Sequence, residues 1–138
     1  MNDVQEQTFH TAVQDGTRLR VFGAAHPGAG ATNYRRWSNN PWSVVEEGGQ
    51  NKAGEWTKTD REKLEQLVKD AHKRKIWIRL YTLNGHAPEL SATNGWTRSY
   101  NFGSLEAVQE RWRAAINAGV DFVATDQYED FARELSHK

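Results

Sequence analysis

The second half of the chain alternates between segments typical of strands and segments typical of helices. Residues 76–83 (IWIRLYTL) form a dense run of β-branched and aromatic residues, which predicts a strand. Residues 120–125 predict another strand, and apolar residues at helical spacing lie before, between and after the two runs. Alternation of this kind produces βαβ crossovers and a parallel sheet. The chain is therefore predicted to be an α/β protein.

Two further strands are predicted earlier in the chain, at residues 18–25 and 42–47, with a loop over 26–41 between them. The strand at 76–83 has two largely apolar faces, which predicts a parallel strand covered on both sides. Residues 84–103 then form a connection longer than an ordinary loop, which is expected to face a ligand. The faces of the strand carry Trp77, Arg79 and Tyr81 on one side and Ile76, Ile78, Leu80 and Thr82 on the other.

Three helices are predicted from capping residues and apolar stripes. Thr59 and Glu62 have the spacing of a capping box at the start of the first helix. Ser104 is predicted to cap the second helix, Gly119 to end it, and Asp126 to cap the third. The stripes are Leu64, Leu67, Val68 and Ala71, then Leu105, Val108, Trp112, Ala115 and Ile116, and finally Tyr128, Phe131, Ala132 and Leu135.

Composition excludes several function classes. The 138 residues include no cysteine, so disulfides, thiolate metal sites and cysteine nucleophiles are excluded. Eighteen Lys and Arg balance 18 Asp and Glu, which leaves no electrostatic footprint for a nucleic-acid partner. No apolar run is long enough for a transmembrane segment, so we expect a soluble domain. The 6 Trp are expected to line a cleft as well as a core, with simple core filling as the alternative.

Two motifs resemble those of the glycerophosphodiester phosphodiesterase and PI-specific phospholipase C superfamily. Residues 71–75 (AHKRK) and the strand ending in Tyr81-Thr82-Leu83-Asn84 are similar to its seventh strand, with Tyr in place of the usual Trp. Residues 118–126 (AGVDFVATD) look like its eighth strand. The resemblance covers residues 60–135 well and 18–50 weakly. It implies the C-terminal half of a (β/α)8 TIM barrel, with about four of the eight strands and three helices.

We therefore expect one partial domain, with an N-terminal extension over residues 1–17 and a half-barrel over 18–138. The superfamily's catalytic histidines and metal-binding carboxylates come from its first four strands, whose motifs are absent here. The chain alone is therefore expected to be inactive. A free half-barrel exposes two sheet edges and its interior face, so we expect a partner, either a second copy in a homodimer or a missing N-terminal half.

The resemblance implies that the complete barrel hydrolyses phosphodiesters of the glycerol- or inositol-phospholipid type, as a lipid head group or a small molecule. Superfamily members often use Ca²⁺ or Mg²⁺, although this chain has no evident metal-ligand spacing. Localisation stays open, since the superfamily includes secreted members whose signal would lie on the other half. Three alternatives remain: a non-catalytic half-barrel binding module, a glycosidase-like barrel fragment, and a compact flavodoxin-like domain.

Working residues in α/β barrels lie at the C-terminal ends of the strands. One of Glu46 and Glu47 is expected to point inward as a cation ligand or general base, and either could pair with Asp126 in a glycosidase. The alternative is an ion pair between Glu46 and Arg79, whose guanidinium could otherwise bind a phosphate. His86 is a weak acid–base candidate.

The pocket wall is predicted to consist mainly of aromatic and amide side chains. Tyr81 stands where the superfamily has a substrate-facing aromatic, and packing inside the barrel is the alternative. Asn84 closes the same motif at the strand end. Trp42, Trp96 and Tyr100 are expected to complete the wall.

Overall fold

A parallel β-sheet forms the centre of the structure, a computed structural model that describes residues 23–25, 30–31 and 35–137. Its four strands follow chain order across the sheet, and each is parallel to its neighbours. The predicted α/β class is therefore confirmed. The predicted extension and the first part of the strand at 18–25 lie outside the described residues. The strands are β1 (Gly23–Ala25), β2 (Arg35–Pro41), β3 (Trp77–Tyr81) and β4 (Phe122–Val123).

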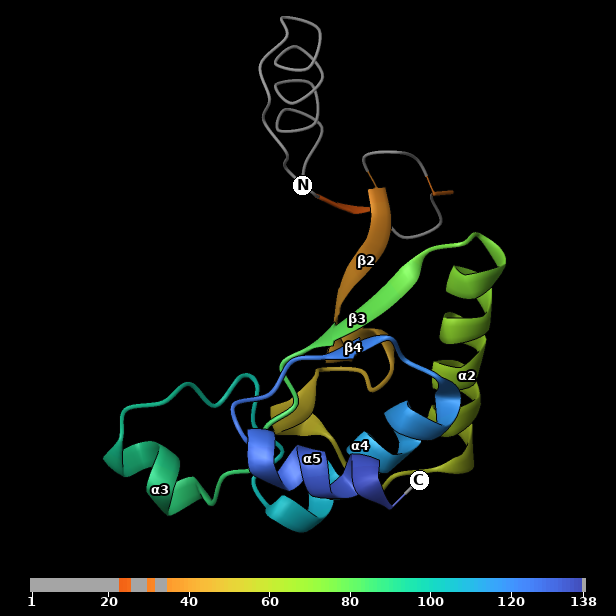
Figure 1. The fold of residues 1–138 in the computed structure, drawn as a ribbon. Helices are drawn as coiled ribbons and strands as arrows, with labels where there is room; N and C mark the ends of the chain where they lie inside the picture. The colour runs from red at the N-terminus through yellow and green to blue at the C-terminus, as the bar shows by residue number, and fades with distance from the viewer. Residues whose placement is uncertain (1–22, 26–29, 32–34, 138) are drawn as a thin grey trace, which may run out of the picture.

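Helices α2, α4 and α5 pack beside the sheet, whereas α3 projects away from them at the opposite side of the molecule (Figure 1). The helix α3 lies inside the long connection after β3, where no helix was predicted. None of the described helices is long and apolar enough to cross a lipid bilayer. The helices are α2 (Lys58–Lys73), α3 (Pro88–Thr93), α4 (Leu105–Ala118) and α5 (Tyr128–Ser136).

The core fills one face of the sheet. Ile78 and Leu80 of β3 are fully buried and belong to the same cluster as apolar residues of α2 and α4, as their alternation predicted. On the other face Trp77 is 54% exposed and Phe122 is 48% exposed, and their rings meet edge to face at 6.1 Å. The prediction that both faces are covered is thus wrong for the described residues. The helix side of the cluster consists of Leu64, Val68, Ala71, Val108 and Trp112.

The strand predicted at 42–47 is wrong. The second strand instead occupies residues 35–41, inside the predicted loop, and a 3-10 helix (Trp42–Val44) follows it directly. The carbonyl of Trp42 accepts hydrogen bonds from the backbone N–H groups of Val45 and Glu46, which turns the chain. The indole Nε1 of Trp42 donates to the Glu46 carboxylate at 2.7 Å, so a hydrogen bond between side chains also spans the turn.

The start of α2 lies two residues before its predicted position. Thr57 and Asp60 form the capping box: the Thr57 hydroxyl accepts from the Asp60 backbone, and the Asp60 carboxylate accepts from the Thr57 backbone. Thr59 and Glu62 have the same spacing, so the pattern alone could not separate the two pairs. The prediction of a helix was right and its capping pair was wrong.

The ends of α4 follow the prediction, and the start of α5 does not. Ser104 accepts a hydrogen bond from the Ala107 backbone, and Gly119 ends α4 in the left-handed conformation at φ 83°. Leu105 is exposed, so it lies off the buried stripe of α4. The N-cap position of α5 is Gln127, not Asp126 as predicted.

At the amino-terminal end of the sheet, one carboxylate fastens β3 to β4. Asp121 Oδ2 accepts a hydrogen bond from the Ile78 backbone at 2.8 Å and lies 2.8 Å from His72 Nε2 at the end of α2. The backbone N–H of Asp121 donates in turn to the Ile78 carbonyl. The two sequence motifs that carry the superfamily resemblance therefore contact each other at this point. These contacts lie at the opposite end of the sheet from the cavities described next.

Candidate functional site

Two adjoining cavities open at the carboxyl-terminal ends of β3 and β4. The larger, of about 620 Å³, lies between the ends of these strands and the connection that contains α3. The smaller, of about 490 Å³, lies between β4 and α5 and includes Arg79. Thr82 and Asp126 line both cavities. The rest of the larger cavity is lined by Asn84, His86, Gly95, Trp96, Thr97, Tyr100 and Asn101.

Asn84 joins the loop after β3 to the loop after β4. Its side-chain oxygen accepts from the Thr125 hydroxyl at 3.0 Å and from the Asp126 backbone at 2.9 Å. Its Nδ2 donates to Asp126 Oδ2 at 2.8 Å. This bond engages one oxygen of the carboxylate that was predicted to cap α5. Asn84 is buried and its bond to Thr125 is buried as well, whereas its two bonds to the exposed Asp126 are partly buried.

Asn101 closes the base of the long connection after β3. Its Oδ1 accepts from the His86 backbone at 2.8 Å, and its Nδ2 donates to the His86 carbonyl at 2.9 Å and to the Ser91 hydroxyl at 3.1 Å. Asn84 and Asn101 also form an isolated parallel bridge, so the connection leaves and returns at the same place. Two buried asparagines thereby fix the wall of the larger cavity.

Gly85 leaves no room for a side chain. A Cβ at this position would lie 2.3 Å from the Ser104 carbonyl oxygen and 2.4 Å from Cγ1 of Val108, both in or next to the first turn of α4. Its backbone N–H donates to the Gln127 side chain at 2.6 Å. Close approach of this glycine to α4 therefore sets where the connection leaves the sheet.

Aromatic rings form much of the exposed wall. The ring of His86 lies 4.7 Å from that of Trp96, which is 47% exposed. Tyr100 is 39% exposed and meets Tyr81 edge to face at 6.1 Å. Tyr81 itself is half-buried and lies behind Tyr100 rather than on the surface of the larger cavity. Trp96 and Tyr100, both named from the sequence as wall residues, therefore line this cavity, together with His86, which was named as an acid–base candidate.

Arg79 points to the open face of the sheet. Its guanidinium donates to the Asn39 side chain on β2 and lies 5.9 Å from the centre of the Tyr81 ring. Within the part of the chain that the structure describes, Arg79 has no carboxylate partner, and the predicted ion pair with Glu46 is absent. Both of its contacts are uncharged, so the positive charge is not neutralised by them.

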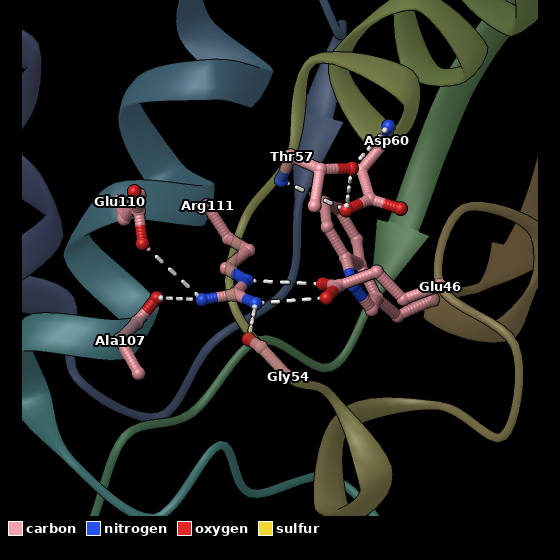
Figure 2. Close-up of polar contacts among 8 residues, drawn as sticks. Glu46, Gly54, Thr57, Asp60, Ala107, Glu110 and Arg111 are labelled. Atoms are coloured by element: carbon pink, nitrogen blue, oxygen red, sulfur yellow. Dashed lines mark hydrogen bonds and ion pairs between the residues drawn. The ribbon is translucent and has the colours of Figure 1, made fainter.

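Glu46 pairs instead with Arg111 of α4, a residue that the sequence reasoning missed. Figure 2 shows the two carboxylate oxygens of Glu46 accepting from Nε at 3.0 Å and from Nη2 at 2.8 Å. Arg111 also donates to the carbonyls of Gly54 and Ala107. Both charged side chains are buried. The carboxylate is bonded to Arg111 and to the Trp42 indole, which favours a structural role for Glu46, and its role as a general base or cation ligand stays a prediction.

The predicted site residues therefore divide into three sets. Asn84, His86 and Trp96 line the larger cavity, and Arg79 lines the smaller one. Trp42 is fully buried in the core and lines neither cavity. Asp126 lines both of these cavities, whereas the buried Glu46 and the exposed Glu47 line neither of the two. The same residues contain no group of three His, Cys, Asp or Glu side chains that could hold a metal ion.

One signal in the sequence could have identified Arg111. It follows Val108 by three positions and precedes Ala115 by four, so it lies on the apolar stripe of its helix. A charged residue on such a stripe is buried only when it is paired.

Comparison with known proteins finds no relative: the chain matches no protein-family model, no curated protein sequence and no solved structure.

Proposed function

We propose that this chain is the C-terminal half of a (β/α)8 barrel that hydrolyses phosphoric diesters, and that it supplies the wall of the substrate pocket. The substrate class is a glycerol- or inositol-phospholipid-type phosphodiester. The observation that carries the proposal is the state of Arg79, a cation on the open sheet face with only uncharged contacts among the described residues. The alternative role for this arginine, pairing with Glu46, is excluded because Arg111 occupies that carboxylate.

Arg79 has the chemistry and the surroundings needed to bind the oxygens of a phosphodiester. Its planar guanidinium can donate two parallel hydrogen bonds to a phosphate, and the Asn39 contact orients the group without cancelling its charge. The aromatic residue beside it, Tyr81, is the one that the superfamily resemblance places at the substrate. The general acid–base groups, and Ca²⁺ or Mg²⁺ where the reaction uses one, would come from the other half of the barrel.

The sheet also supports the proposal of a partner with four further parallel strands. A closed barrel needs eight strands, and the described sheet has four, with β1 and β4 at its two edges. Its uncovered face carries Trp77 and Phe122, large apolar side chains of the kind that fill a barrel interior. A second four-stranded half would pair both edges and cover this face, which removes an aggregation hazard.

Binding of a phosphodiester tests the role of Arg79. We expect the purified chain to bind glycerophosphoinositol, and Arg79→Gln to weaken binding at least about tenfold, because a charged hydrogen bond contributes roughly 1.5–3 kcal/mol. Arg61→Gln is the matched control, since Arg61 is an exposed arginine on α2 that pairs with Glu65 at 3.9 Å. Equal binding by wild type, Arg79→Gln and Arg61→Gln would refute the proposal.

Light scattering of the same protein tests the partner. A particle of about twice the 15.8 kDa chain mass would indicate that two copies form the complete barrel. Phosphodiester turnover by that particle supports the hydrolase, whereas binding without turnover favours the alternative of a binding module. A stable, well-folded monomer with both sheet edges protected from amide exchange would contradict the half-barrel.

A further inference from the structure

We propose that Asn94 is a site of spontaneous deamidation, at which the side-chain amide is converted to the carboxylate of aspartate or isoaspartate. The sequence contains two Asn-Gly pairs, Asn84-Gly85 and Asn94-Gly95. One pair is buried and bonded to distant residues, and the other is exposed at the end of a short helix. This difference carries the inference, which goes beyond the proposed function and does not require it.

The reaction at an Asn-Gly pair needs only groups of the chain and water. The backbone nitrogen of Gly95 attacks Cγ of Asn94 and loses its proton to water, while Nδ2 takes up a proton and leaves as ammonia. The new bond between nitrogen and Cγ closes a cyclic imide, and water then adds to one of the imide carbonyls. Opening at Cγ gives aspartate, and opening at the backbone carbonyl carbon gives isoaspartate. Glycine favours the attack because it has no Cβ to obstruct the approach of its nitrogen.

The groups that react at Asn94 are held only by local hydrogen bonds. Asn94 and Gly95 are exposed at the end of α3, where Gly95 has φ 65°. The Asn94 side chain donates to the Leu90 carbonyl at 2.8 Å, and the Gly95 N–H donates to the Ala92 carbonyl at 3.3 Å. The helix has 6 residues, and a helix this short has little stability of its own. Opening of its last turn therefore releases both the amide and the attacking nitrogen to water.

The pair Asn84-Gly85 has the same sequence, but tertiary hydrogen bonds hold both reacting groups. Both residues are buried. Asn84 Nδ2 donates to Asp126, and its side-chain oxygen accepts from the Thr125 hydroxyl. The Gly85 N–H donates to the Gln127 side chain at 2.6 Å. Attack at Asn84 therefore requires separation of the loops after β3 and β4, so the fold protects this pair and leaves Asn94 open to reaction.

Conversion of Asn94 would alter the wall of the larger cavity, which Gly95 and Trp96 line. Aspartate cannot donate to the Leu90 carbonyl, and its negative charge is unfavourable at the C-terminal end of a helix. Isoaspartate lengthens the backbone by a methylene group between Asn94 and Gly95. That link lies inside the turn closed by the hydrogen bond from the Trp96 N–H to the Ser91 carbonyl at 2.9 Å. Either product should therefore weaken the attachment of Trp96.

Peptide mapping by mass spectrometry tests the site in the full chain, kept in mildly alkaline buffer at physiological temperature. Conversion at Asn94 should be at least about tenfold faster than at Asn84, whose hydrogen bonds must first break. Asn51 is the matched control, because it is exposed but precedes Lys52, and it should convert at least about tenfold more slowly than Asn94. In urea, where the tertiary bonds are lost, the two Asn-Gly pairs should convert at similar rates.

Asn94→Gln should remain unconverted at this position, because the longer side chain disfavours ring closure. After incubation, amide exchange at Trp96 should be faster in the wild-type chain and unchanged in Asn94→Gln. Equal conversion at Asn94 and Asn84 in the folded chain would overturn the proposal. So would an Asn94 that stays intact in the folded chain while it converts in urea. Faster exchange at Trp96 in incubated Asn94→Gln would overturn the link to the cavity wall.

Discussion

Arg111 binds both carboxylate oxygens of Glu46 and so joins α4 to the turn that follows β2, across 65 positions of sequence. The guanidinium also lies over the rings of Trp56 and Phe102, at 5.4 and 5.1 Å from their centres. Every donor direction of the arginine is used by an oxygen, and both of its flanks are covered by aromatic rings. The pair therefore fixes the position of the turn against the helix.

Replacing Glu46 with glutamine should destabilise the fold strongly. Glu46→Gln removes the buried counter-ion of Arg111 and leaves the half-exposed Glu110 at 3.4 Å, and breaking a buried pair typically costs about 3–5 kcal/mol. Urea denaturation followed by tryptophan fluorescence measures the loss. The neighbouring Glu47 is exposed, and Glu47→Gln should change the unfolding free energy by less than about 0.5 kcal/mol. Equal effects of the two substitutions would show that the ion pair does not stabilise the turn.

Asn84→Ala should loosen both loops that border the cavities. It leaves the Thr125 hydroxyl and the Asp126 backbone N–H without their acceptor, at about 1–3 kcal/mol for each group that stays buried. Amide hydrogen exchange should become faster at Asp126 and Gln127. Asn94→Ala removes an exposed asparagine side chain that donates to the Leu90 carbonyl on α3, and it should leave exchange at these two amides unchanged.

Gly85→Ala should destabilise the protein by about 1–3 kcal/mol, because the new methyl group overlaps a backbone oxygen and a buried valine. Thermal unfolding measures this change. Gly54→Ala is the control, since no atom lies within 4 Å of a Cβ built at that position. A melting temperature for Gly85→Ala that matches Gly54→Ala would mean that the connection can leave the sheet along another path.

Asp121→Ala should cost more stability than His72→Ala. The contact between the two side chains is partly exposed, and such surface pairs contribute about 0–1 kcal/mol. Asp121 additionally accepts from the Ile78 backbone, and loss of that acceptor costs about 1–3 kcal/mol. Melting of the two single variants and the double variant gives the order. A larger loss in His72→Ala would contradict it.

Periodicity predicted the elements that pack on the core. The stripes of α2 and α4 and the buried side of β3 repeat at the spacing of their structures, so burial follows directly from the pattern. The strand at 42–47 failed because a hydrogen bond between the Trp42 indole and the Glu46 carboxylate turns the chain. A short apolar run does not distinguish a strand from a tight turn of this kind. The turn here includes a bond between two side chains four positions apart, which an apolar pattern does not reveal.

The sequence predicted where the site lies, because its residues follow the ends of strands. It did not predict how the side chains are bonded, because those bonds join distant parts of the chain. Asn84, His86 and Trp96 were found by their place after a strand. The partners of Asp126 and Glu46 lie 42 and 65 positions away, and neither spacing has a local signature. The sequence suggested a cap at Asp126 and a pair between Glu46 and Arg79. The structure has other tertiary contacts in place of both.

The long connection between Asn84 and Asn101 has a consequence for how this protein can be altered. Its two ends are joined to each other by backbone and side-chain hydrogen bonds, and its middle contributes Trp96 and Tyr100 to the cavity. The segment between these ends can therefore be exchanged as a cassette, much as a surface loop is grafted between antibodies. A library confined to residues 92–100 would change the lining of the larger cavity while the Arg111 pair and the two asparagines at the base of the segment are left as they are.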